Sequence, residues 1–333
     1  MQLAELLDRL GYSESPAFLR PRQNAFRIDP DFGHIFRQAS KTLALRGVYT
    51  LRPDVAGHAP SVPVIYVCEA DSEKTADKFH RLIWNQDVVP FVLISTPLGV
   101  KLYSGFRHQR RRNGNTAGIL QPLTDFTQID ELVDDFSADT VNSGRLWQRR
   151  AGDVTPEHRL NWKLLTNLRS VDNALRRRGL QSGMSHALIG KYVFLHYLRD
   201  RGILSPRKLQ RWGIDEAAVF GHNASAEGLV AVVAKLDAWL NGDVFPLDFG
   251  KRGAPKDEHV SWVAAVFSGD EFSESGGQQL QLDFQAYDFS YIPIETLSIV
   301  YELCTSNSCM PPTVLRQAAV GEKSAHTTHL FRS

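Results

Sequence analysis

The chain has 333 residues, a length typical of about two domains. Its hydrophobic fraction of 43% and charged fraction of 23% are those of folded proteins and exclude wholesale disorder. The 38 basic and 37 acidic side chains give a formal net charge of +1, so any contact with a polyanion has to come from a local patch.

No apolar run is long enough to span a membrane, and the amphipathic start, Met1 to Leu10, lacks the apolar stretch of a signal peptide. We therefore expect no contact with a membrane. The cysteines are too few and too badly spaced for a disulfide framework or a closed zinc site, which favours a reducing, cytoplasmic location. They are Cys68, Cys304 and Cys309.

The first half of the sequence alternates between strand and helix patterns. Apolar runs predict strands at residues 46–51, 64–68, 90–95 and 100–103. A helix capped by Asp71 or Ser72 is expected between the second and third runs. A short helix over 125–136 and a linker over 137–150 follow. This order of elements predicts a small mixed α/β layer.

From residue 155 onward, apolar residues recur at three- and four-residue steps, as in helices. Helices are predicted at 160–175, 185–202, 229–240, 258–267 and 293–301. We therefore predict an α/β domain with a mixed, nuclease-like sheet at residues 1–145 and an all-helical connector domain at residues 146–303. An irregular, disordered tail is predicted at residues 304–333.

Three acidic residues flank the predicted strand at 64–68. Asp54 precedes it, and Glu69 and Asp71 follow it. Magnesium-dependent nucleases hold their metal with carboxylates around such a strand and add a lysine that helps to activate water. Here Asp71 stands where the lysine would be, so the residues are at most a vestigial nuclease site. The alternative is that Asp71 caps a helix and Glu69 ends a strand.

The strongest local charge lies in a loop between residues 105 and 118. Its arginines are Arg107, Arg110, Arg111 and Arg112. Such a basic loop can contact DNA phosphates and release counterions, although a solvated loop without a partner fits the sequence equally well. The helical half is also basic, at Lys191, Arg199, Arg201, Arg207, Lys208 and Arg211. We expect His186 and His196 to have packing or surface roles rather than to bind a metal.

Several segments resemble a known family in its own order. They are FHRLIWNQ at 79–86, VPFVL at 89–93, VKLYSGF at 100–106, HALIGKYVFLHYLRDRGIL at 186–204, LNGDVF at 240–245 and YDFSYIPIETLSIVYE at 287–302. They are similar to the amino-terminal part of large adenine-specific (N6) DNA methyltransferases of restriction–modification and phage-defence systems, including the single-chain type IIG kind. The resemblance implies methyl transfer from S-adenosylmethionine to N6 of adenine in DNA.

In that family, a Gly-Ala-Tyr-Tyr-Thr-Pro loop over S-adenosylmethionine comes next. A glycine-rich loop and Asn-Pro-Pro-Tyr, which grips the flipped adenine, come later. The sequence contains none of these motifs. We therefore expect a truncated protein that lacks the catalytic domain, has no catalytic or cofactor-binding residues and is inactive as a methyltransferase.

The residues after Glu302 offer a reason for the missing motifs. When codons are read from the third base onward, those for Ser324–Arg332 permit Gly-Ala-Tyr-Tyr-Thr-Pro. The same offset over Ser306–Thr313 permits another family-like stretch. We therefore expect a frameshift between Glu302 and Ser306.

The function expected to remain is weak DNA or partner binding through the arginines and the basic helices. Two alternatives stay open. One is a magnesium-dependent endonuclease built on the three acids, and the other is a non-enzymatic subunit that pairs with a separate methyltransferase subunit. We also expect the apolar face of Ile292 to Val300 to be exposed, because it would pack on the missing methyltransferase domain.

Overall fold

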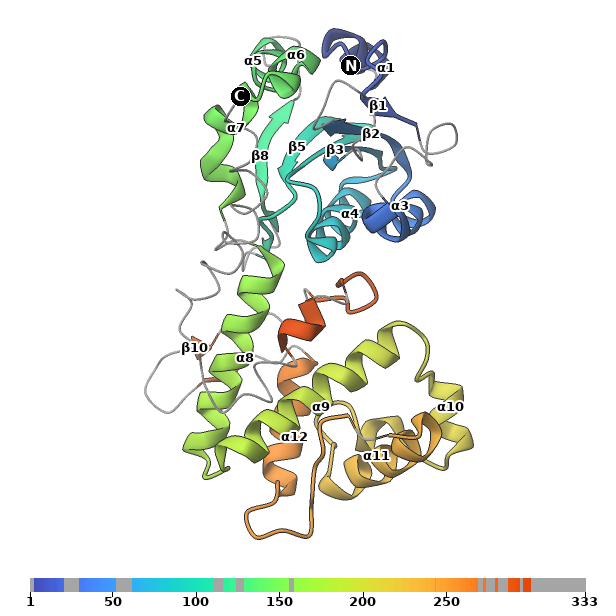
Figure 1. The fold of residues 1–333 in the computed structure, drawn as a ribbon, viewed down its shortest axis with the longest axis vertical. Coiled ribbons are helices and arrows are strands. Elements are labelled where there is room, and N and C mark those ends of the chain that lie inside the picture. Colours follow the sequence, from blue (N-terminus) through green and yellow to red (C-terminus); the bar gives the residue numbers. More distant parts are fainter. Residues whose placement is uncertain are drawn as a thin grey trace, which may run out of the picture.

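The computed structural model of the chain describes residues 3–20, 30–51, 62–110, 116–123, 129–155, 159–242, 244–268, 272–273, 279–280, 287–293 and 296–300. The predicted tail at 304–333 and the proposed change of reading frame lie outside the described residues. Figure 1 shows a β-sheet with its covering helices at one end of the molecule and a second group of helices at the other end.

Six strands form a mixed sheet in the order β1-β2-β3-β4-β5-β8. Strands β3 and β4 are parallel, and the other neighbouring pairs are antiparallel. The strands are β1 (Phe18–Leu19), β2 (Leu45–Leu51), β3 (Val62–Glu69), β4 (Phe91–Thr96), β5 (Gly99–Ser104) and β8 (Ile119–Leu123). The mixed sheet predicted from the apolar runs is therefore confirmed.

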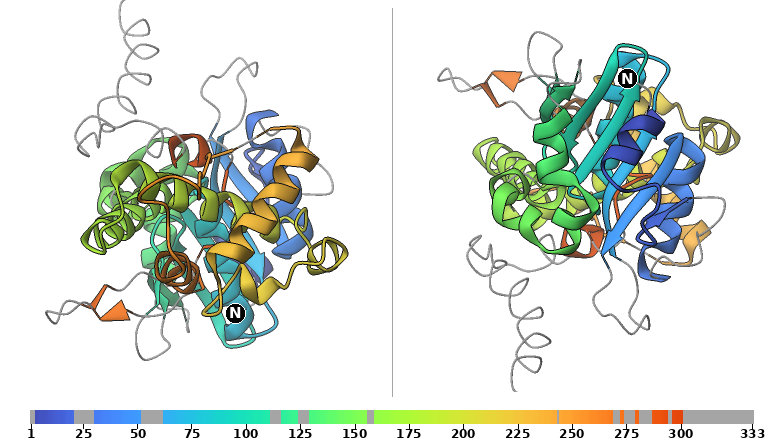
Figure 2. Two further views of the ribbon diagram at one scale, coloured as in Figure 1. Left: turned by 90° about the horizontal axis from the view of Figure 1, so that it is seen from below. Right: turned by 90° about the horizontal axis from the view of Figure 1, so that it is seen from above.

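The sheet is the middle layer of three. Ile65 and Val67 of β3 pack against α1, α5, α6 and α7, whereas Tyr66 and Cys68 point to the other face and pack against α3 and α4. The view from above in Figure 2 shows α5 to α7, in green, on one side of the strands and α3, in blue, on the other. The covering helices are α1 (Leu3–Arg9), α3 (Pro30–Thr42), α4 (Glu73–Gln86), α5 (Ile129–Phe136), α6 (Ala138–Asn142) and α7 (Arg145–Arg150).

Helix α4 has well-defined ends. Ser72, one of the two predicted caps, accepts a hydrogen bond from the Thr75 amide at 3.2 Å. At the other end Asp87 adopts a left-handed conformation with φ 53°. Its buried carboxylate accepts a hydrogen bond from Arg159 Nε at 3.1 Å. Burial raises the pKa of Asp87, and Arg159 opposes this shift.

The predicted linker at 137–150 is wrong. It contains helices α6 and α7, and the side chains of Val141 and Leu146 are buried against the sheet. Ion pairs hold these short helices, since Arg145 pairs with Asp139 and Arg150 Nε donates to Asp135 Oδ2 at 2.7 Å. These helices are too short to show a long apolar periodicity. Contacts with neighbouring elements stabilise them, which is why the sequence pattern does not predict them.

The second group of helices encloses its own apolar core. They are α8 (Leu160–Arg177), α9 (Ser182–Asp200), α10 (Pro206–Arg211), α11 (Ala226–Leu240) and α12 (Asp257–Phe267). Helix α8 ends as predicted at Gly179, which has φ 86°, and the Leu180 amide bonds the Leu175 carbonyl at 3.1 Å. A short ladder, β9 (Phe272–Ser273) with β10 (Gln279–Leu280), departs from the expected all-helical composition of this part.

The apolar face predicted to be exposed between Ile292 and Val300 is buried. Both residues have 0% exposed side chains and belong to the core of the second helical group. Leu297 and Ile299 pack against the same core. Residues 296–300 are helical, as predicted for part of 293–301. They pack against the chain's own helices and do not expose the predicted surface for another domain.

Among the described helices, none combines the length and the apolar character needed to cross a membrane.

Candidate functional site

Two of the three predicted acids are described, and each has a hydrogen-bond partner within the chain. Glu69 ends β3 and accepts a hydrogen bond from Arg46 Nε at 2.6 Å. Asp71 is exposed and accepts a hydrogen bond from Ser72 Oγ at 3.0 Å. Hydrogen bonds from Thr75 and Ser72 lower the pKa of Asp71. Asp54 lies outside the described residues.

These contacts are those of a strand end and a helix start. Over the part of the chain that the structure describes, no three histidine, cysteine or carboxylate side chains are grouped to hold a metal ion. The described residues therefore offer no grouped set of ligands for a magnesium ion.

The connection from β3 to α4 contains no glycine-rich cofactor turn. The connection from β3 to α4 is the place where a glycine-rich turn would approach a cofactor. It runs through Ala70, Asp71 and Ser72 and contains no glycine. The Ser72 side chain also occupies the helix start by accepting from the Thr75 amide.

The arginine loop, defined as residues 105–118, is described in part. Arg107 is exposed, as predicted. The backbone of Arg110 belongs to a short ladder in which β6 (Gln109–Arg110) pairs with β7 (Thr116–Ala117). Arg111 and Arg112 lie outside the described residues. Of the four predicted DNA-binding residues, the described ones are therefore Arg107, which follows β5, and the backbone of Arg110 in β6.

The base of the arginine loop is tightly packed around His80 of α4. His80 Nε2 lies 2.8 Å from the Ser104 carbonyl, and the Ser104 amide donates to the Gly118 carbonyl at 2.9 Å. A Cβ atom on Gly118 would lie 2.4 Å from His80 Cε1, and its φ of 137° also disfavours other residues. Complete burial lowers the pKa of His80 to about 4, so the imidazole is neutral at pH 7.

Aromatic and cationic side chains join this loop base to the second helical group. His108 stacks on Trp84 with ring centroids 5.3 Å apart, and Trp84 contacts Tyr287 at 5.5 Å. Lys163 of α8 donates from Nζ to the His108 carbonyl at 2.6 Å and lies 5.7 Å from the Trp84 ring centroid. The arginine loop therefore starts from a fixed position between the sheet layer and the helices.

A bridging segment, defined as residues 287–292, also fastens the two parts. It forms hydrogen bonds with residues of four helices. Its hydrogen bonds are Asn167 Nδ2 to Tyr287 Oη at 2.9 Å, the Asp288 amide to Asn85 Oδ1 at 2.8 Å, the Phe289 amide to Asp200 Oδ2 at 3.1 Å and Gln38 Nε2 to the Ser290 carbonyl at 3.1 Å. The segment thus bonds α8, α4, α9 and α3 at once.

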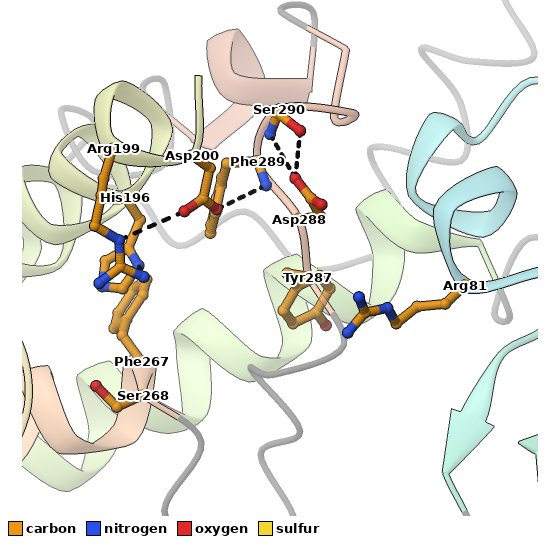
Figure 3. Close-up of a pocket in the computed structure, with 10 residues that line it drawn as sticks. All are labelled: Arg81, His196, Arg199, Asp200, Phe267, Ser268, Tyr287, Asp288, Phe289 and Ser290. Carbon is orange, nitrogen blue, oxygen red and sulfur yellow. Dashed lines mark hydrogen bonds and ion pairs between the residues drawn. The ribbon is translucent and has the colours of Figure 1, made fainter. Parts of the chain in front are cut away.

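An interlayer pocket of about 600 Å³ lies beside the bridging segment (Figure 3). Helix α4 contributes Arg81, and α9 contributes His196, Arg199 and Asp200. The remaining lining residues are Phe267, Ser268, Tyr287, Asp288, Phe289 and Ser290. In Figure 3 the Arg81 side chain extends from α4 toward Tyr287, while Arg199 lies beside His196 and Phe267.

His196 is held by aromatic rings and by Arg199. Its ring lies 5.1 Å from Phe267 and meets Phe220 edge-on at 5.2 Å. Arg199 Nη2 lies 3.2 Å from His196 Nδ1, and since arginine only donates, Nδ1 is the acceptor. Burial lowers the pKa of His196 well below its usual range, so the ring is neutral and carries its proton on Nε2.

The predicted basic surface of the helical half is only partly exposed. Lys191 is 1% exposed and is one of the buried residues of α9, so it adds no surface charge. Arg199 and Arg201 lie over the rings of Phe220 and Tyr197, respectively, at 4.5 and 4.4 Å. Arg201, Arg207 and Arg211 are exposed. His186 faces Asp172, with Nε2 3.5 Å from the carboxylate, in a packed position between α8 and α9.

Sequence reasoning missed the interlayer pocket and the bridging segment. Their residues come from positions as far apart as 81 and 290, and no spacing rule connects them. The clearest available signal was the position of Arg81, Arg199 and Tyr287 within the segments that resemble the methyltransferase family.

A scan against protein-family models finds no match. A search of curated proteins and a search of solved structures likewise find none.

Proposed function

We propose that this chain is the DNA-binding, non-catalytic amino-terminal part of an adenine-specific DNA methyltransferase of a restriction–modification system. In this proposal an α/β domain comes first and a helical connector follows it, and both act in the cytoplasm. The residues of this chain bind and position DNA. The methyl transfer from S-adenosylmethionine belongs to a catalytic domain or subunit with the motifs that this sequence lacks.

One observation carries the proposal: the segments that resemble the family converge in space. Asn85, from the segment 79–86, bonds the Asp288 amide of the segment 287–302. Asp200, from the segment 186–204, bonds the Phe289 amide of the same segment. Helix α9 also meets the segment 240–245, where a Cβ on Gly190 would lie 2.3 Å from the Phe245 ring.

This convergence has a physical meaning. The segments that are similar to one family therefore form a common framework in this chain. The framework ends at the base of the arginine loop, where Trp84 contacts both His108 and Tyr287. A loop whose base is fixed in this way loses less conformational freedom when its arginines bind phosphates.

The experiment is a titration of a labelled DNA duplex, followed by fluorescence anisotropy, at several salt concentrations. A variant in which Arg107, Arg110, Arg111 and Arg112 are all changed to Ala should bind more weakly. Because each phosphate contact contributes roughly 0.9 to the slope of log K against log salt, the slope should fall by about 2 to 4.

The matched control removes positive charge elsewhere on the same layer. Lys41, Lys74 and Lys78 are exposed on α3 and α4, outside the arginine loop. Changing these three to Ala should leave the salt slope within error of the unmodified chain. Equal slopes for the arginine variant and the unmodified chain would remove the loop from the account.

A further inference from the structure

We infer that the outer surface of α10 and α11 binds single-stranded nucleic acid, with an unpaired base stacked on Trp239 and phosphates on the arginines of α10. Both helices belong to the second group of helices, at the end of the molecule opposite the sheet (Figure 1). The inference adds a second surface and another form of nucleic acid to the proposed function, and it does not depend on duplex binding by the arginine loop.

The first argument is an exposed pair of tryptophan rings. Trp239, near the end of α11, is 47% exposed. Trp212, which follows α10, meets it edge-on with ring centroids 6.2 Å apart. Trp212 is partly buried and packs against the helical core, so the exposed ring has a fixed neighbour. A nucleic-acid base that stacks on the exposed indole would cover apolar surface that now faces water.

The second argument is the set of cations around these rings. On α10, Arg207 and Arg211 are four residues apart and therefore share a face. The row beside them contains Lys208 and Trp212. On α11, Lys235 adds a cation one turn before the exposed tryptophan. None of these four cationic side chains pairs with a described carboxylate, so they are available to the phosphates of a ligand.

Lys208 links the rings and the cations. Its Nζ lies 2.9 Å from the ring centroid of Trp239 and 5.3 Å from that of Trp212, so it covers part of the exposed indole. A surface contact between an ammonium group and a ring is weak, and a lysine side chain is flexible. The ammonium group can therefore move to a phosphate and leave the ring face to the adjoining base.

The third argument separates single-stranded nucleic acid from other polyanions. An acidic peptide would pair with the cations but would leave the tryptophan without a planar partner. A duplex keeps its bases paired inside, so it offers phosphates without a free base. Each nucleotide of a single strand brings one phosphate and one flat base, which matches cations and aromatic rings that lie side by side.

The experiment measures the binding of a short labelled oligothymidylate to the 333-residue chain by fluorescence anisotropy. An abasic oligomer of the same length keeps the phosphates and lacks the bases. We expect it to bind at least about tenfold more weakly, because base stacking on an aromatic side chain is lost. Equal binding of the two oligomers would overturn the inference. Equal binding of polyglutamate would also overturn it and would assign the surface to acidic peptides.

Variants of the exposed ring test the stacking. Trp239→Ala should weaken oligothymidylate binding about tenfold, and Trp239→Phe, which keeps an aromatic ring, should recover most of the loss. Leu98→Ala is the matched control, because Leu98 is an apolar side chain of the sheet layer with 74% exposure, and it should not change the affinity. Unchanged affinity in Trp239→Ala would contradict the inference.

Variants of the cations test the phosphate contacts. The combined change of Arg207 and Arg211 to Gln should lower the slope of log K against log salt by about 1.4, since each phosphate contact on a single strand contributes roughly 0.7. Lys74 and Lys78, which are exposed on α4, provide the charge-matched control when both are changed to Gln. The control should keep the slope of the unmodified chain, and an unchanged slope in the arginine variant would count against the inference.

Photocrosslinking locates the strand without any variant. An oligothymidylate that carries bromodeoxyuridine should crosslink to the peptide that contains Trp239, whereas crosslinks confined to residues 105–118 would refute the inference. The variant of the arginine loop keeps the two proposals apart. It should lose duplex binding if the proposed function is correct, and it should keep oligothymidylate binding in either case. Loss of oligothymidylate binding in that variant would overturn the inference.

Discussion

At the scale of single residues, the structure shows the charge state of two histidines, which the sequence alone does not give. His80 and His196 are both buried, and burial lowers the pKa of each. Each has one buried ring nitrogen without a hydrogen-bond partner among the described residues, and the other nitrogen of each has a different contact. His80 is bonded to the Ser104 carbonyl and supports the arginine loop, whereas His196 accepts from Arg199 and packs among the rings of Phe220 and Phe267. Burial pattern alone could not separate these roles, since both residues lie on apolar helix faces.

The buried state of His80 predicts a dependence of stability on pH. Its pKa is about 4 in the folded chain and about 6.5 in the unfolded chain. Below pH 6.5 the unfolded chain therefore takes up a proton that the folded chain does not. The stability is complete above pH 6.5 and falls as the pH approaches 4, by roughly 3 kcal/mol for this residue.

Urea unfolding between pH 4 and 7.5 measures this effect. His80→Gln cannot titrate, so its stability should fall less than that of the unmodified chain over the same range. His222→Gln, at an exposed position, should follow the unmodified chain. An NMR titration of the His80 ring gives a second measure, and a midpoint near 6.5 would refute the prediction even if His80→Gln fails to fold.

At the scale of elements, the prediction from sequence succeeds where burial is continuous. Strands β2 to β5 lie within about two residues of the predicted positions because each has apolar residues on both faces. The prediction from sequence fails where contacts with neighbouring elements stabilise a segment. Helices α6 and α7 were predicted as a linker because their pairing depends on Asp135 and Asp139, whose contacts no local pattern reveals.

The pocket could not be predicted for the same reason. Its lining combines residues of α4, α9, the end of α12 and the bridging segment, which are distant in the sequence. The sequence predicts an exposed apolar face from Ile292 to Val300 because it gives no sign of what covers Ile292. The covering partner is the chain's own helical core.

Helix α9 provides a prediction at this scale, because two of its glycines have different surroundings. A Cβ on Gly190 would lie 2.3 Å from the ring of Phe245, whereas nothing lies within 4 Å of a Cβ on Gly183. Gly190→Ala should therefore lower the free energy of unfolding by about 1–3 kcal/mol through overpacking. Gly183→Ala should raise it by about 0.5–1 kcal/mol through helix propensity. Urea denaturation measures both, and similar effects at the two positions would contradict the packing between α9 and Phe245.

At the scale of the whole molecule, the sheet layer and the helical group are fastened at several points. Arg159 at the start of α8 pairs with Asp87 at the end of α4, and Lys163 bonds the His108 carbonyl. The bridging segment adds bonds to α3, α4, α8 and α9. This arrangement holds the base of the arginine loop at the junction of the two parts. A DNA duplex bound there would lie against both.

Hydrogen exchange with and without a saturating DNA duplex at low salt tests this claim most directly. The account predicts slower exchange in peptides that cover residues 105–118 and the first turns of α8, and unchanged exchange in β1 and β2 at the far edge of the sheet. Slower exchange confined to α10 and α11, with none in residues 105–118, would contradict it.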